Sequence, residues 1–221
     1  MKVECFLIVS ILWVFSLSLH EFGHAWVAYR GGDHTVAEKG YLTMNPFRYL
    51  HPVQSLLLPL IFVILGGIGL PGGAVYINRE LLRSRAWDTA VSLAGPAMDL
   101  LLILLLGFAF KIGWIPHERD NLITLSLSFA LALLVGALFL NLLPVPPLDG
   151  FQAIAPWLPP ETRDKLFGLS NIGLFLVLLA FWFIPPVNLA FWGGVRQLCS
   201  FFDVEPIWIT FGQRAFRFWD H

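Results

Sequence analysis

Long apolar runs separated by short charged loops are the feature that most constrains this chain. Hydrophobic residues make up 57% of its 221 residues and charged residues only 13%, whereas soluble domains usually carry about 25% charged residues. The runs lie at about 4–29, 53–70, 87–110, 122–143, 172–184 and 187–203. Because a helix of about 20 apolar residues spans the hydrocarbon core of a bilayer, we expect a multi-pass protein of the cell membrane.

Two of the runs are poorly suited to a straight spanning helix. Pro59 and a glycine pair interrupt 53–70, and 172–184 ends at two prolines before it reaches spanning length. Between the first two runs, 35–44 reads as two short strands around a Lys-Gly turn, and 73–78 could add a third strand. The expected fold is therefore all-α, with about five to six transmembrane or re-entrant helices and a small β-hairpin or sheet between the first segments.

One membrane-embedded domain accounts for residues 1–221. We divide it into a core at 4–155, C-terminal helices at 172–203 and an interfacial aromatic tail at 204–221. The first run is not expected to be a cleaved leader, because no small-residue cleavage site follows it. Two isolated cysteines offer no disulfide framework, and a net charge of −1 without a basic tract gives no indication of nucleic-acid binding.

A histidine motif ends the first apolar run. His20-Glu21-Phe22-Gly23-His24 is an H-E-x-x-H pattern, in which histidines four residues apart lie on one helical face and can bind one metal ion. Zinc suits two imidazoles and a carboxylate with a fourth position for water, and Glu21 would be the general base for that water. The alternative is a polar helix end that is hydrogen-bonded at the membrane interface.

The third ligand is expected from the segment that follows the fourth apolar run. Asn141 to Gly150 reads NLLPVPPLDG, and its three prolines prevent a regular helix. An unwound segment at membrane depth can present its carbonyls and the Asp149 carboxylate to a cavity. The alternative is an ordinary proline-rich loop with a surface aspartate.

Together, the two motifs resemble the site-2 protease family of intramembrane zinc metalloproteases, in a compact form without a PDZ domain. That family pairs HExxH with a distant N-x-x-P-x-P-P-L-D-G element, and the resemblance covers about residues 10–155. It implies one zinc ion per chain on His20, His24 and Asp149, with Glu21 as the catalytic base. It also implies that Asn141 makes a polar contact to the substrate or oxyanion.

One departure from the family lies in the third apolar run. Gly95-Pro96-Ala97 resembles the start of the family's G-P-x-x-N element, but Asp99 stands where Asn is usual. A carboxylate is costly within a membrane unless it is protonated or paired. Asp99 in place of Asn therefore puts in doubt an intramembrane hydrogen bond near the site. It does not remove a metal ligand.

The proposed ligands also constrain the topology. His24 and Asp149 each lie near the C-terminal end of an apolar run, so one membrane face must hold both. A full crossing by 53–70 would separate them, and we therefore expect 53–70 to be re-entrant or a short hairpin. This arrangement places most Lys and Arg residues of the loops on the zinc side, which the positive-inside rule assigns to the cytoplasm.

These features predict a zinc-dependent endopeptidase that hydrolyses peptide bonds of transmembrane protein or peptide substrates. A substrate helix would have to unwind, and it could add as a strand to the stretch 73–78. A membrane metal transporter or metal-binding scaffold is the rival reading, because intramembrane His, Asp and Glu also line ion pathways. A relative that binds transmembrane helices without cleaving them is a third. The oligomeric state stays open.

Overall fold

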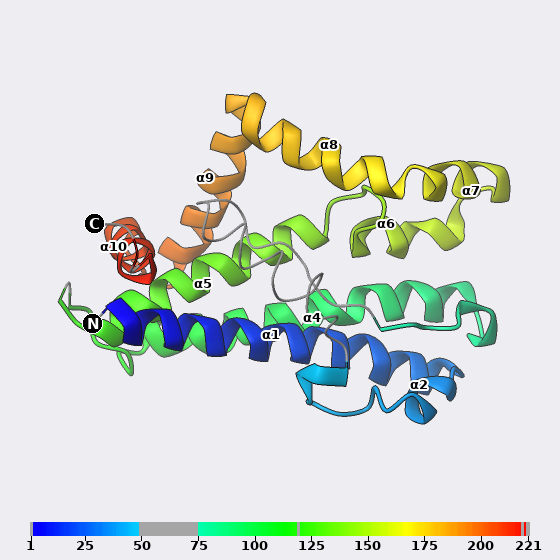
Figure 1. Ribbon diagram of the computed structural model, residues 1–221, viewed down its shortest axis with the longest axis horizontal. Helices are drawn as coiled ribbons and strands as arrows, with labels where there is room; N and C mark the ends of the chain where they lie inside the picture. Colours follow the sequence, from blue (N-terminus) through cyan, green and yellow to red (C-terminus); the bar gives the residue numbers. More distant parts are fainter. Residues whose placement is uncertain (1, 49–74, 119, 218, 220–221) are drawn as a thin grey trace.

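The computed structural model describes residues 2–48, 75–118, 120–217 and 219 (Figure 1). Its regular elements are α1 (Lys2–Gly31), α2 (Thr35–Glu38), η1 (Pro46–Arg48), η3 (Arg79–Leu81), α4 (Arg85–Lys111), α5 (Leu122–Asn141), α6 (Asp149–Ile154), η4 (Ala155–Trp157), α7 (Pro160–Gly168), α8 (Ser170–Phe183), α9 (Pro185–Phe201) and α10 (Pro206–Phe216).

Three helices of the described chain, α1, α4 and α5, are long and apolar enough to cross a membrane. In the most apolar stretch of α5, 78% of the residues are buried, compared with 33% in α1 and 39% in α4. Helix α5 is therefore the centre of the bundle, and α1, α4, α9 and α10 all pack against it. An apolar helix that is buried all round is expected to lie inside such a bundle.

Side-chain caps set the start of the second and third spanning helices. The Ser84 hydroxyl accepts a hydrogen bond from the Trp87 N–H at 3.4 Å, just ahead of α4. The Asn121 side chain accepts from the Ile123 and Thr124 N–H groups at 2.9 and 3.3 Å, just ahead of α5. Both caps satisfy N–H groups that lack a partner in the first helical turn.

The C-terminal end of α1 and the N-terminal end of α4 meet at one end of the bundle. The Arg83 N–H donates to the Gly31 carbonyl at 2.9 Å, and the backbone of Gly31 faces Leu82 and Trp87. The two helices run antiparallel, side by side (Figure 1). The predicted re-entrant segment 53–70 lies outside the described residues, so that prediction stays open.

The two C-terminal apolar segments form a bent pair. Residues Phe175–Phe183 of α8 and Pro185–Phe201 of α9 meet at 96°, with the break at Ile184. Counting this pair as one span gives up to four candidate crossings in the described chain. Helix α10 is seen nearly end-on in Figure 1, across the direction of α1 and α5, with Trp208 and Phe216 buried. The membrane-interface role expected for 204–221 stays a prediction.

The predicted β-hairpin at 35–44 is wrong, because its first residues form a helix. Thr35 donates from both its N–H and its hydroxyl to Asp33 Oδ1, at 3.0 and 2.6 Å, and this local bonding starts α2. The Lys-Gly pair then ends that helix. Gly40 has a φ of +75°, with Gly40 N–H bonded to Ala37 O and Tyr41 N–H to Val36 O. This is a Schellman end, which competes with a hairpin turn for the same glycine.

The third expected strand, at 73–78, is also absent from the described chain. Residues 73 and 74 lie outside the described residues, and 75–78 have no regular secondary structure. Side chains accept hydrogen bonds from two of their N–H groups: Glu21 from Val75 and Asp33 from Asn78. All the regular elements of the described residues are therefore helical. Over the described residues the fold is all-α, without the β element that the sequence led us to expect.

Candidate metal centre

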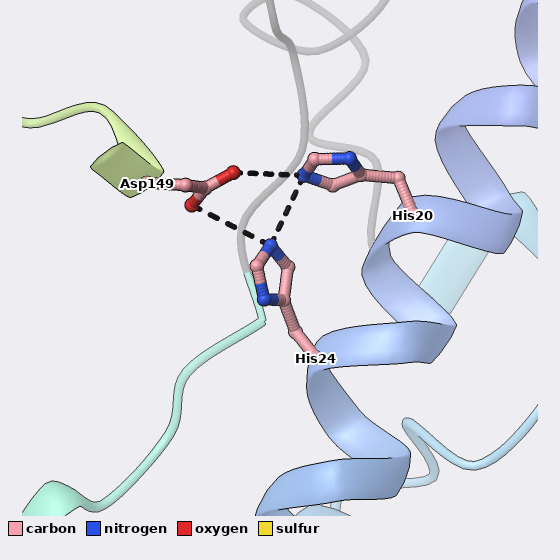
Figure 2. A group of neighbouring side chains, drawn as sticks. All are labelled: His20, His24 and Asp149. Atoms are coloured by element: carbon pink, nitrogen blue, oxygen red, sulfur yellow. Dashed lines mark hydrogen bonds and ion pairs between the residues drawn. The ribbon is translucent and has the colours of Figure 1, made fainter. Parts of the chain in front are cut away.

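Helix α1 directs two imidazoles toward α6 from one face. His20 and His24 lie one helical turn apart, and both are buried, with 6% and 7% of their surface exposed. Their Nε2 atoms are 3.0 Å apart and point toward the start of α6 (Figure 2). The H-E-x-x-H motif therefore brings its two histidines to a common point inside the bundle.

Asp149 completes the group from a different part of the chain. Helix α5 ends at Asn141, the proline-containing segment follows without regular helix, and α6 begins at Asp149 itself. The Asp149 oxygens lie 3.2 Å from His20 Nε2 and 3.5 Å from His24 Nε2 (Figure 2). Burial alone would raise the pKa of the Asp149 carboxyl, but the positive charge of the two imidazoles when they are protonated, and their hydrogen bonds to the carboxylate, lower this pKa below its ordinary value. The carboxylate is therefore ionised.

The hydrogen bonds on the far side of each ring fix the tautomers. His24 Nδ1 lies 2.7 Å from the Val91 carbonyl, which can only accept, and His20 Nδ1 lies 2.7 Å from Asp99 Oδ2. In the neutral rings, the proton is thus on Nδ1 and the lone pair on Nε2. When both rings are neutral, two imidazole lone pairs and the Asp149 carboxylate converge on one point, which is a donor set that suits a zinc ion.

The spacing of this group fits zinc. Tetrahedral ligands at about 2.0–2.1 Å from zinc lie about 3.3–3.4 Å from one another. The two Nε2 atoms are 3.0 Å apart, and each has one of the two Asp149 oxygens at a similar distance, Oδ2 at 3.2 Å from His20 and Oδ1 at 3.5 Å from His24. The three ligand atoms lie within 4.8 Å of one another. A Cβ at Gly95 of α4 would overlap the Nε2 atoms of both histidines. The glycine thus keeps open the space into which the imidazoles point.

Glu21 and Asn141, the two expected catalytic residues, occupy different surroundings. Glu21, which follows His20 in the sequence, is buried. Its Oε2 accepts a hydrogen bond from the Val75 N–H at 3.0 Å. Asn141 is buried at the C-terminal end of α5. In the part of the chain that is described, the hydrogen bonds and ion pairs of the three-residue group involve Asp99 and Val91 but not Asn141.

Of the groups that support the ligands, Asp99 could be recognised in the sequence and the Val91 carbonyl could not. Asp99 stands out as a charged residue within an apolar run. The sequence left open whether it makes an intramembrane hydrogen bond, and in the structure it makes one to His20. The Val91 carbonyl carries no such signal, because any backbone carbonyl could take that place. Such outer partners orient the ligands of a metal site and raise their basicity.

Similar proteins are zinc metalloproteases by name. The chain is 42% identical over 217 residues to "Putative zinc metalloprotease Rip2" of Mycolicibacterium smegmatis, covering 98% of this chain and 82% of that protein. It is 43% identical to Rip2 of Mycobacterium tuberculosis over 97% of this chain and 81% of the relative. It is 30% identical to "Putative zinc metalloprotease YwhC" of Bacillus subtilis over 85% and 84%.

No protein-family model matches the chain. No solved structure matches it significantly. The two Rip2 relatives nevertheless align with 97–98% of this chain, and at 42–43% identity they share its family. The chain therefore belongs to the site-2 protease family of membrane zinc metalloproteases.

Proposed function

We propose that this chain is a zinc-dependent intramembrane endopeptidase that cleaves transmembrane segments of other proteins. His20, His24 and Asp149 hold the zinc ion, one per chain, and Glu21 is the general base. The observation that carries the proposal is the meeting of these three ligand groups, from α1 and α6, inside a bundle of apolar helices. Buried ionisable groups at membrane depth are costly, and function is the usual reason for keeping them.

Each residue of the centre has a defined task in peptide hydrolysis. Zinc in this position supplies a Lewis acid and lowers the pKa of a bound water. Glu21 takes the proton from the attacking water and delivers it to the leaving amine. Val75 N–H, at 3.0 Å, orients the Glu21 carboxylate between these two transfers. Asn141 contacts the substrate carbonyl or the oxyanion formed from it.

The substrate reaches this centre as an unwound peptide, because a helix hides its carbonyls in backbone hydrogen bonds. The proline-containing segment between Asn141 and Asp149 leaves backbone groups without helical partners near the ligands. These groups can hold water and an extended substrate backbone. The site faces the cytoplasm in this proposal, since the loops at its end of the bundle carry most of the Lys and Arg residues.

The first test measures zinc in the detergent-purified chain. Wild type is expected to hold about one zinc per chain, by the one-site geometry. His24→Ala and Asp149→Ala are expected to lose it, whereas Glu21→Gln keeps it because Glu21 is not a ligand. Full zinc retention in Asp149→Ala would exclude the three-ligand site.

The second test separates a protease from the rival transporter or scaffold. Wild type and Glu21→Gln are incubated in liposomes with end-labelled single-span peptides, and the products are identified by mass spectrometry. Internal cuts made by wild type only, with zinc retained in both proteins, support the protease. Zinc flux into the liposomes that persists in Glu21→Gln, without any cut peptide, would instead support the transporter.

A further inference from the structure

We infer that Arg79 is a positioning residue that holds Asp149, the third ligand, in place through Gln152. The inference rests on the zinc site proposed above, because it concerns the geometry of that site. Arg79 begins η3 in the described segment ahead of α4. Its hydrogen bonds go to Asp88, Ser92 and Gln152 and not to the three ligands. It therefore acts on Asp149 through α6, the helix that carries this ligand.

The Arg79 guanidinium joins three parts of the chain. One of its terminal nitrogens donates to the Asp88 carboxylate and, at 3.1 Å, to the Ser92 hydroxyl, both on α4. The other terminal nitrogen donates to the side-chain oxygen of Gln152 on α6. Arginine presents several N–H donors in a rigid planar fork, so one side chain can fix two helices relative to each other.

Gln152 transmits this constraint to the ligand. It lies three residues after Asp149 on the same face of α6. Its amide nitrogen also donates to the Pro147 carbonyl at 2.8 Å, in the segment just before Asp149. The amide therefore holds both α6 and the residues that lead into it, and Arg79 ties this unit to α4.

The same helix, α4, fixes the other two ligands. The Val91 carbonyl and the Asp99 carboxylate, both on α4, accept from the Nδ1 atoms of His24 and His20. Ser92, which contacts Arg79, is the neighbour of Val91. All three ligands thus take their positions from α4: the histidines by direct hydrogen bonds and Asp149 through Arg79 and Gln152. Loss of the arginine should free only the third ligand.

The test measures the affinity of the purified full chain for Zn²⁺ by competition with a chelator in detergent. Arg79→Gln and Gln152→Leu are each expected to weaken binding about tenfold to a hundredfold, as outer partners of metal ligands do. Gln152→Glu keeps the acceptor for the guanidinium but loses the donor to the Pro147 carbonyl, so its affinity is expected to lie between those of wild type and Gln152→Leu. The double variant should lose less affinity than the two single losses added together, because both changes break the same Arg79–Gln152 contact.

Two further variants separate the possible failures. Arg83→Gln removes an arginine four residues along, whose guanidinium lies over the Trp87 ring, and is expected to leave zinc affinity unchanged. Asp149→Ala is the reference for loss of the ligand itself. If Asp149→Ala binds zinc as wild type does, the proposed site is wrong.

A different pattern would overturn the role of Arg79 alone. That pattern is loss of affinity in Asp149→Ala together with wild-type affinity in Arg79→Gln. Thermal unfolding of the zinc-free proteins shows whether a variant acts through folding. A Gln152→Glu variant that unfolds like wild type but binds zinc as weakly as Gln152→Leu would also overturn the inference, because its acceptor for Arg79 is intact.

Discussion

Gly95 lies where the two imidazoles point, and its missing side chain makes room for the metal. We predict that Gly95→Ala abolishes zinc binding, because the added Cβ would overlap both Nε2 atoms. Helix propensity acts in the opposite direction, since alanine is favoured over glycine by about 1 kcal/mol in a helix interior. The measurement is zinc per chain in the purified variant.

Gly193→Ala is the matched control for that change. Gly193 is also helical, in α9, and a Cβ there would meet nothing within 4 Å. This variant should keep its zinc and unfold at the same temperature as wild type or slightly higher. Equal zinc content in the two alanine variants would mean that the imidazoles do not point to the metal as described.

Asp99 orients His20, and its charge and its acceptor oxygen can be separated by mutation. In the wild type, Asp99 Oδ2 lies 2.7 Å from His20 Nδ1. Asp99→Asn keeps an oxygen that can accept this hydrogen bond, whereas Asp99→Leu removes the acceptor. We predict about a tenfold to hundredfold loss of zinc affinity in Asp99→Leu and a smaller loss in Asp99→Asn. Chelator competition measures both. Equal losses would show that the charge, and not the hydrogen bond, is what His20 requires.

At the scale of elements, apolar runs predicted helices well and local turns poorly. The runs at 87–110 and 122–143 correspond to α4 and α5 within a few residues, because a bilayer leaves a long apolar segment few other structures. The stretch 35–44 contains too few apolar residues for such a constraint. There the Asp33 carboxylate accepts a hydrogen bond at the start of α2, and Gly40, with its positive φ, ends this short helix.

The pairing of α1 with α4 depends on a glycine inside the histidine motif. A Cβ at Gly23 would come 2.8 Å from the Ala94 carbonyl oxygen and 2.7 Å from Met98 Cγ. Small residues allow membrane helices to approach this closely. We predict that Gly23→Ala destabilises the protein by about 1–3 kcal/mol, the usual cost of overpacking, which thermal unfolding in detergent would reveal as a lower midpoint.

The comparison for this prediction is Gly136→Ala in α5. There a Cβ would meet Phe191 at 3.6 Å, an ordinary contact, so the midpoint should change little. Because α4 also carries Val91 and Asp99, a shift of α1 from α4 should lower the zinc content of Gly23→Ala as well. A wild-type midpoint and zinc content in Gly23→Ala would contradict the close packing.

At the scale of the whole molecule, the sequence predicted which residues meet but not what holds them together. The H-E-x-x-H spacing and the Asp-Gly after three prolines pointed to the three groups that the structure brings within 4.8 Å. The spacing follows from helix geometry, which sequence alone determines. The links through Arg79, Gln152 and the Val91 carbonyl depend on packing between distant segments, for which a single sequence has no periodic signal.

The direction of the bundle in the membrane gives the last prediction. Helix α4 starts beside the end of α1, near the metal centre, and ends at Lys111. We predict that accessibility tags inserted after Arg83 and at Gly113 report opposite sides, with Arg83 in the cytoplasm. Basic residues cluster in the loops at the Arg83 end, and such residues stay in the cytoplasm. Gly113 suits an insertion because a side chain there would meet nothing within 4 Å.

A tag ahead of Lys2 tests the same topology through a different helix. Because α1 and α4 run antiparallel, this tag should report the same side as Gly113. If Arg83 and Gly113 reported one side, α4 would not cross and the membrane arrangement would be wrong. If all three tags reported the reverse sides, both crossings would stand, but the metal centre would open away from the cytoplasm and substrates would have to approach from the other face.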